Sequence, residues 1–230
     1  MMKTMAIIPA AGAGVRMGTK QAKQFLDFCG KPLLAMTLEK FQVCASIDGV
    51  ILVVPSHDVE YCQKEIIDRY RLNKVEKVVA GGERRQDSVR KGLMAIEGRC
   101  KWVLIHDGVR PFIESFLIEA VVKSVKKERA VITALPAKET VKKVDADGFI
   151  IKTYDRKQVY LVQTPQAFQY DDIMTAHQKA FLEAWDEVTD DALLVEKMGV
   201  PVKVITGSEN NIKVTTPHDL ELVRFLMGKR

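Results

Sequence analysis

Near its amino terminus the chain reads Met5-Ala-Ile-Ile-Pro-Ala-Ala-Gly-Ala-Gly-Val-Arg-Met-Gly-Thr-Lys-Gln-Ala-Lys23. The apolar run from Met5 to Ile8 predicts a buried strand. The small residues that follow keep bulky side chains away, so backbone N–H groups can approach the oxygens of a phosphate. Arg16 adds a planar fork of donors and Lys23 a mobile point charge. The stretch therefore predicts a strand followed by a loop that wraps a polyphosphate.

Two common phosphate-binding loops do not match this stretch. A Walker A loop requires Gly, four residues and then Gly-Lys-Ser/Thr, whereas Gly18 is followed by Thr-Lys and has the wrong spacing from the earlier glycines. The dinucleotide fingerprint Gly-x-Gly-x-x-Gly begins at Gly12 and Gly14 but has Met17 in its third position. Both a P-loop NTPase and a nicotinamide dehydrogenase are therefore disfavoured. Taken alone, the loop is equally a glycine-rich turn with two solvated cations.

Length and composition suit one large α/β domain or two small ones, and we favour one domain over residues 1–230. The 230 residues are 47% hydrophobic, which is enough to bury a substantial core. Thirty-five basic and 30 acidic residues are interspersed, so the charge pattern favours anionic small molecules and not nucleic acid. No apolar stretch approaches the roughly 18 residues of a membrane span, and the N-terminal apolar part is too short for a signal peptide. The four scattered cysteines form no Cys-x-x-Cys pair, so we expect reduced thiols and a cytoplasmic protein.

Short apolar runs alternate with longer amphipathic stretches in the first part of the chain. Strands are expected at residues 6–9, 49–55, 77–80, 102–106 and 130–135, and helices at 33–41, 57–70, 86–96 and 115–127. Strands this apolar are buried on both faces, which is typical of a parallel sheet covered by helices. Ligands of such sheets bind at the carboxyl ends of the strands, where the loop after Pro9 and the segment around Asp107 both fall.

The alternation breaks between Lys138 and Thr153. Two short extended runs flank Asp147-Gly148, and Asp-Gly is a strong hairpin signal. An isolated hairpin with apolar side chains is marginal in water, so this arm, residues 138–158, either lies on its own domain or embraces a second subunit. We expect the second. After the arm come helices near 171–185 and 189–198, a strand at 202–205, an extended piece at 211–214 and a helix from 217.

Polar residues cluster where predicted strands and helices meet. Gly82 permits close backbone approach and Ser88 offers a hydrogen bond to a base edge, although Asp87 or Ser88 is equally a candidate helix cap. Asp107 and Arg110 follow an apolar strand. The Asp107 carboxylate could bind Mg²⁺ or ribose hydroxyls, and the Arg110 guanidinium could bind an anionic substrate. Alternatively, the two side chains form an ion pair that closes a turn.

Other polar residues give weaker signals. We interpret His106 as a packed, hydrogen-bonded histidine and not as a catalytic base, since no Ser or Cys nucleophile motif accompanies it. Thr189 is expected to cap its helix, and Lys213 is either solvated or a phosphate contact. Arg156 is either a site residue or part of a surface salt bridge. The Gln-Thr-Pro-Gln run at 163–166 is expected to be a loop.

Taken in order, these motifs resemble the 2-C-methyl-D-erythritol 4-phosphate cytidylyltransferases over essentially the whole chain. The resemblance rests on Pro9-Ala-Ala-Gly-x-Gly-x-Arg-Met-Gly, Lys23-Gln-Phe-Leu, Gly30-Lys-Pro, Gly81-Gly, Arg85-x-Asp-Ser, His106-Asp-x-x-Arg-Pro, Arg156, Gln163-Thr-Pro-Gln, Thr189-Asp and Asn211-Ile-Lys-Val-Thr. It implies a Rossmann-like, GT-A-like nucleotidyltransferase fold, with a mostly parallel sheet flanked by helices and a protruding hairpin arm that forms a homodimer.

The resemblance also implies a reaction and its residues. CTP and methylerythritol phosphate would give CDP-methylerythritol and pyrophosphate, with Mg²⁺ required and Asp107 as a candidate metal ligand. The implied catalytic residues are Arg16 and Lys23. The implied CTP contacts are Pro9, Ala10, Ala11, Gly12, Ala13, Gly14, Gly82, Arg85, Ser88, Asp107 and Gly108. The implied contacts to the second substrate are Asp107, Arg110, Thr140, Arg156, Thr189 and Lys213, with Thr140 and Arg156 reaching across from the other subunit.

Two alternative activities fit the sequence less well. The sister family that acts on ribitol 5-phosphate usually has Ala-Gly-Gly after the first strand and Asn-Arg before Thr-Pro-Gln, where this chain has Pro9-Ala-Ala-Gly and Asp155-Arg156. A regulatory module without turnover would typically have lost Arg16, Lys23 or Asp107, and all three are present. Methylerythritol phosphate is therefore favoured. Ala22 departs from the family pattern, where proline is common, and is expected to loosen the loop.

Overall fold

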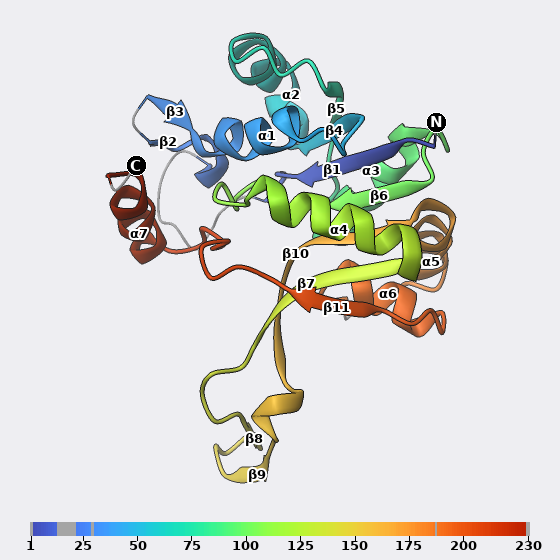
Figure 1. The fold of residues 1–230 in the computed structure, drawn as a ribbon, viewed down its shortest axis with the longest axis vertical. Coiled ribbons are helices and arrows are strands. Elements are labelled where there is room, and N and C mark those ends of the chain that lie inside the picture. The colour runs from blue at the N-terminus through green and yellow to red at the C-terminus, as the bar shows by residue number, and fades with distance from the viewer. Residues whose placement is uncertain (1, 13–21, 29, 187, 229–230) are drawn as a thin grey trace.

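The computed structural model describes residues 2–12, 22–28, 30–186 and 188–228. Within them a seven-stranded sheet has the order β11-β7-β10-β6-β1-β4-β5 (Figure 1). Its strands are β1 (Thr4–Pro9), β4 (Gly49–Val54), β5 (Val75–Ala80), β6 (Trp102–Ile105), β7 (Ala130–Pro136), β10 (Tyr160–Gln169) and β11 (Lys203–Thr206). β10 runs antiparallel to both of its neighbours, and the other paired strands of this sheet are parallel. The predicted mostly parallel α/β sheet is confirmed.

Helices cover both faces of the sheet. They are α1 (Leu33–Val43), α2 (Val59–Tyr61), α3 (Arg85–Ile96), α4 (Ser115–Glu128), α5 (Tyr170–Leu182), α6 (Asp191–Lys197) and α7 (Pro217–Gly228). Shorter pieces are the 3₁₀ helices η2 (Lys23–Phe25), η3 (Ser56–Asp58) and η5 (Arg156–Gln158), the π-helix η4 (Cys62–Asp68), and the ribbon strands β2 (Asp27–Phe28) and β3 (Lys31–Pro32). The helix expected at 57–70 is thus a succession of 3₁₀, α and π turns.

Successive side chains of each strand point to opposite faces of the sheet, so the core is divided into a cluster on each face. In β1, Ala6 and Ile8 pack in the cluster formed by α1 and α4, whereas Met5 and Ile7 pack in the cluster formed by α3, α5 and α6. A third cluster joins α7 to the segment after β6. The described cysteines, Cys44, Cys62 and Cys100, are free and buried, while Cys29 lies outside the described residues. Within the described part of the chain, no helix combines the length and apolarity that a membrane crossing requires.

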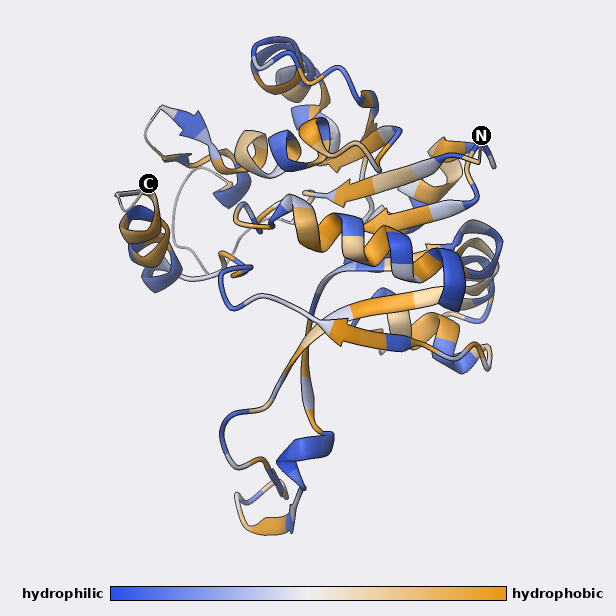
Figure 2. Cartoon of the chain, in the orientation of Figure 1, coloured by the Kyte–Doolittle hydropathy of each residue, from blue (hydrophilic) through white to orange (hydrophobic). Residues whose placement is uncertain are grey.

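The predicted hairpin arm is confirmed. β8 (Lys142–Val144) pairs antiparallel with β9 (Ile150–Thr153), and the arm projects away from the sheet (Figure 1). Its apolar side chains have little to pack against: Phe149 is 73% exposed and Ile150 64%. Figure 2 shows the tip at β9 as an apolar segment beside hydrophilic turns.

Two local predictions were wrong. Residues 163–166 form part of the central strand β10 and not a loop, with Gln166 paired to Ile105 of β6 and to Ile132 of β7. Polar residues and a proline argue against a central strand, but here the register with β7 shifts between Val162 and Gln166, and the polar groups of the run are hydrogen-bonded. At α6 the N-cap is Asp190 and not Thr189, because Asp190 Oδ1 accepts a hydrogen bond from the Leu193 amide at 3.1 Å.

Gly92 provides a test of the packing between α3 and the sheet. A Cβ at this position would lie 2.7 Å from Ile7 Cγ2 and 3.1 Å from Val53 Cγ2. We expect Gly92→Ala to lower the free energy of unfolding by about 1–2 kcal/mol, because overpacking outweighs the gain in helix propensity. Urea unfolding at neutral pH measures this change. Met94→Ala, on the exposed side of α3, should stay within about 0.5 kcal/mol of wild type; equal stability of both variants would contradict the packing described.

Candidate active site

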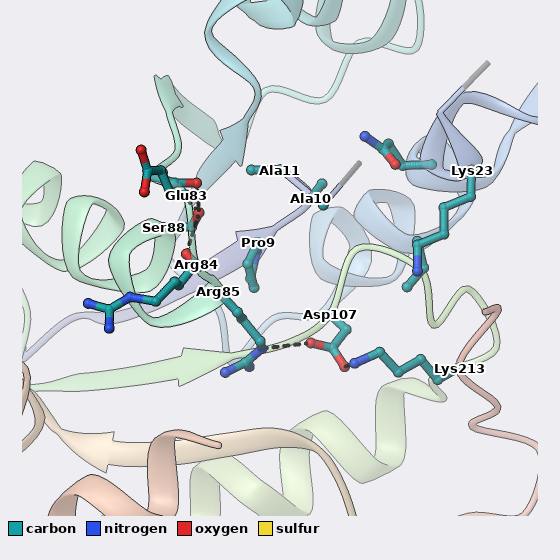
Figure 3. A pocket seen from close by; sticks show the side chains of 14 residues that line it. Pro9, Ala10, Ala11, Lys23, Glu83, Arg84, Arg85, Ser88, Asp107 and Lys213 are labelled. Carbon is teal, nitrogen blue, oxygen red and sulfur yellow. Dashed lines mark hydrogen bonds and ion pairs between the residues drawn. The ribbon is translucent and has the colours of Figure 1, made fainter. Parts of the chain in front are cut away.

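Two cavities lie side by side at the carboxyl ends of the strands. The first has a volume of about 260 Å³ and is lined by Pro9, Ala10, Ala11, Gly12, Lys23, Gln24, Gly82, Glu83, Arg84, Arg85, Ser88, Asp107, Val109 and Lys213 (Figure 3). The second, of about 230 Å³, is lined by Arg85, Asp107, Arg110, Val162, Gln163, Thr164, Gln166, Thr189, Asp190 and Lys213. Arg85, Asp107 and Lys213 line both. These three residues form a common wall, called here the shared wall.

Most of the predicted site residues meet at these cavities. Those expected to contact CTP and described by the structure line the first cavity, except Gly108, which packs behind it: a Cβ there would lie 2.9 Å from Ala10 Cβ. Arg110, Thr189 and Lys213 line the second. Thr140 and Arg156 are exposed on the arm and are not among the lining residues. Ala13, Gly14 and Arg16 lie outside the described residues.

Close backbone packing shapes one side of the first cavity. A Cβ on Gly81 would lie 2.5 Å from Ala11 Cβ, so only glycine lets the end of β5 approach the loop after β1. The Gly82 amide donates to Ser88 Oγ at 3.1 Å, which turns the start of α3 toward the same loop. Asp87 caps this helix by accepting from the Arg84 amide at 3.3 Å. Capping by Asp87 is therefore confirmed, while Ser88 remains at the cavity.

Three cations surround the carboxylate of Asp107. Its Oδ1 lies 3.3 Å from Arg85 Nε, and its Oδ2 lies 3.3 Å from Arg110 Nε and 3.0 Å from Lys213 Nζ (Figure 3 shows the pairs with Arg85 and Lys213). Burial by itself would raise the pKa of Asp107, but these cations hold it well below its usual range. The predicted Asp107–Arg110 ion pair is confirmed. The shared wall is thus a charged cluster with more cations than carboxylates.

His106 fixes the backbone beneath this cluster. Its Nε2 lies 3.2 Å from the Arg110 carbonyl, which can only accept, so Nε2 carries the proton. Its Nδ1 then accepts from the Thr164 hydroxyl at 3.0 Å, and Thr164 Oγ1 accepts from the Asp107 amide at 3.1 Å. Complete burial lowers the pKa of His106 to about 4, which keeps the ring neutral at pH 7. The interpretation as a packed, hydrogen-bonded histidine is confirmed.

The second cavity contains residues to which the sequence analysis assigned no role in the site. Gln166 donates from Nε2 to Asp190 Oδ2 at 2.7 Å, and its Oε1 accepts from the amides of Asp191 and Ala192 at 3.1 Å each. It therefore holds the first turn of α6 against β10. Gln163 and Thr164 line the same cavity. The only signal for these residues in the sequence was their place in the Gln-Thr-Pro-Gln motif.

The described residues form no cage of side chains for a magnesium ion. Among them no group of three or more His, Cys, Asp or Glu side chains is placed to hold a metal. Both oxygens of Asp107 already pair with cations, and these three positive charges would repel a metal ion. A role for Asp107 as a metal ligand therefore stays a prediction from resemblance.

Comparison with known proteins decides the family. The family model described as IspD, 2-C-methyl-D-erythritol 4-phosphate cytidylyltransferase, matches residues 4–229. The chain belongs to this family. Relatives carrying this name include one from Syntrophus aciditrophicus, 44% identical over 99% of this chain and 97% of its own, and one from Clostridium novyi, 45% identical over 96% and 95%. As a member of the cytidylyltransferase family, the chain is a nucleotidyltransferase.

Solved structures of the cytidylyltransferase family share this fold. The structure of 4-diphosphocytidyl-2C-methyl-D-erythritol synthase from Anaerococcus prevotii superposes with a TM-score of 0.87 at 35% identity, covering 99% of this chain and 96% of its own. The predicted Rossmann-like nucleotidyltransferase fold is confirmed. The sister family that acts on ribitol 5-phosphate is not favoured by these matches.

The buried His106 predicts a pH dependence of stability. Its pKa falls from 6.5 to about 4 on folding, so between these values the unfolded chain binds a proton that the folded chain does not. The free energy of unfolding should therefore fall by about 3 kcal/mol as the pH drops from 7 to 4. The depressed pKa values of Asp107 and Asp191 add a further loss that begins at about pH 5 and grows below their ordinary value of 3.8.

Urea unfolding at intervals between pH 7 and pH 4 measures this loss. His106→Asn should be less stable at pH 7 but should lose much less stability across the same window. His57→Gln, which alters a histidine whose side chain is 80% exposed, should keep the wild-type dependence. A dependence unchanged in His106→Asn would show that another group titrates.

Proposed function

We propose that the enzyme transfers a cytidylyl group from CTP to 2-C-methyl-D-erythritol 4-phosphate and releases pyrophosphate. The observation that carries this proposal is the shared wall of Arg85, Asp107 and Lys213 between two cavities. Two anionic substrates, one in each cavity, would meet at this wall. The family's name gives the sugar phosphate and the cytidylyl group that is transferred to it.

The chemistry asks for charge neutralisation more than for proton transfer. An oxygen of the methylerythritol phosphate attacks the α-phosphorus of CTP, and the bond from that phosphorus to the bridging oxygen breaks as pyrophosphate leaves. The attacking oxygen is already ionised at neutral pH, so no general base is required. Lys23 lines the first cavity, and we assign it to the triphosphate and to the charge that develops on the leaving group. Arg16 is proposed to share this role by family resemblance.

The remaining contacts divide between the two cavities. Ser88, with the backbone of Ala11 and Gly82, is proposed to bind the cytosine, because the close glycine packing exposes backbone groups on that side. Arg110 and Lys213 are proposed to bind methylerythritol phosphate, since the cations around Asp107 outnumber its single charge.

Magnesium is proposed to bind to the triphosphate oxygens and not to a protein cage. Mg²⁺ usually binds through one or two carboxylates together with substrate phosphates. The single carboxylate on the shared wall is already ion-paired. When bound, the ion would neutralise part of the triphosphate charge.

The arm is proposed to form a homodimer. Phe149, Ile150 and Ile151 are exposed at its tip, which is costly in water unless another surface covers them. Arg156 donates from Nη1 to the Lys138 carbonyl at 3.1 Å, so the base of the arm presents this cation away from the cavities of its own chain. We propose that Thr140 and Arg156 complete the second cavity of a partner subunit. The buried free thiols support a cytoplasmic location.

A substrate panel tests the activity directly. Purified protein with CTP, Mg²⁺ and methylerythritol phosphate should release pyrophosphate, measured by a coupled phosphate assay. Ribitol 5-phosphate should react much more slowly, and omission of the sugar phosphate gives the background rate. Faster turnover with ribitol 5-phosphate would contradict the substrate assignment.

Hybrid dimers test the shared site. Lys23→Ala and Arg156→Ala should each be nearly inactive as purified dimers. After subunit exchange, their mixture should recover about a quarter of wild-type activity, because half of the dimers are hybrids with one complete site each. A mixture of Lys23→Ala with Arg110→Ala is the control, since both residues belong to the same chain's site and no hybrid is complete. Equal activity of the two mixtures, with exchange confirmed by mass spectrometry, would argue for sites built within one chain.

A further inference from the structure

A chain of polar contacts, with Asp191 and His177 buried at its inner end, extends behind the shared wall. Arg85 Nη1 lies 2.7 Å from Asp191 Oδ2, and Asp191 Oδ1 lies 3.1 Å from His177 Nε2. The side chains of Asp191 and His177 are 1% and 2% exposed. Neither lines the two cavities of the site. The contacts therefore run from α5 through α6 to α3 and end at Asp107.

Asp191 has little freedom to move. Its amide donates to Gln166 Oε1, and it occupies the first turn of α6 next to the capping residue Asp190. Burial by itself would raise the pKa of Asp191, but Arg85 and His177 hold it below the usual range, so the carboxylate stays ionised. A buried carboxylate needs a partner on each oxygen to offset its lost hydration. Arg85 and His177 supply one partner each.

Arg85 is held from two directions. Asp191 binds one end of its guanidinium and Asp107 its Nε, and the planar fork fits both carboxylates at once. The side chain still contributes to both cavities and is 31% exposed. Its orientation at the shared wall is therefore set by the buried Asp191. The His177 ring, packed on α5, sets the orientation of that carboxylate in turn.

We propose that Asp191 and His177 are positioning residues that hold Arg85, and through it Asp107, in the geometry that the transfer reaction requires. Only the expected effect on turnover rests on the proposed function; the positioning of Arg85 does not. Without the His177 N–H, the Asp191 carboxylate can rotate and the guanidinium loses its fixed anchor. The cost should then appear in turnover, because a misplaced charge at the wall stabilises the transition state less well.

A double-mutant cycle tests this coupling. His177→Leu should lower kcat/KM for CTP by about tenfold in the wild-type background and by less than about twofold in an Arg85→Met background, because residues joined in one network through Asp191 couple. Most of the loss should fall on kcat. His177→Gln, whose side-chain amide can reach the same carboxylate oxygen, should restore most of the activity. Arg85→Lys replaces Arg85→Met if the latter does not fold.

Tyr170→Phe is the matched control on the same helix. It removes the buried hydrogen bond that the Tyr170 hydroxyl donates to the Leu93 carbonyl at 3.0 Å and the one that it accepts from the Gly98 amide at 3.3 Å. Both lie at the opposite end of α3 from Arg85. It should lower the urea midpoint but change kcat/KM by less than about twofold in either background. Equal loss of kcat/KM by His177→Leu in both backgrounds, or a loss that Tyr170→Phe reproduces, would overturn the proposal.

A measurement without substrate separates this inference from the proposed function. The Arg85 Nε–H resonance, assigned by its absence in Arg85→Lys, should exchange slowly with water in wild type, His177→Gln and Tyr170→Phe. It should exchange much faster in His177→Leu. Slow exchange in His177→Leu would overturn the positioning role, whereas a wild-type protein that lacks cytidylyltransferase activity would contradict only the proposed function.

Discussion

One buried carboxylate surrounded by three cations determines the arrangement of the site. Asp107 is 5% exposed, so water stabilises its charge poorly and ion pairs must replace hydration. Arg85, Arg110 and Lys213 provide them from α3, from the turn after β6 and from the segment before α7. This single interaction joins distant parts of the chain and places their remaining positive charge against two cavities.

Neutral groups hold the backbone on which these charges sit. His106 and Thr164 link the Asp107–Arg110 turn to β10, and Gln166 links β10 to α6. Hydrogen bonds between neutral groups suit this task, since they fix geometry without adding charge to a site that must bind anions. The charged and neutral groups together give a wall that is positive toward ligands and rigid behind. A reaction between two phosphates needs both properties.

The local pattern of apolar residues was sufficient to predict most strands of the sheet. β1, β4, β6 and β7 are apolar runs buried on both faces, and the alternation with amphipathic helices predicted their parallel order. The arm was predictable because Asp147-Gly148 has a specific turn chemistry. β10 was missed, since the polar Gln-Thr-Pro-Gln run interrupts its apolar pattern and its stability comes from partners on β6, β7 and α6.

The sequence by itself determined the fold class, the first strand of the sheet and, through motif resemblance, the family and most residues of the two cavities. These properties depend on periodicity, turn chemistry and residue type, which are local. Only the tertiary structure decided that Asp107 is shared by three cations and that His177 and Asp191 stand behind Arg85. No spacing along the chain signals such contacts, because they arise where helices from separate parts of the sequence pack against the same edge of the sheet.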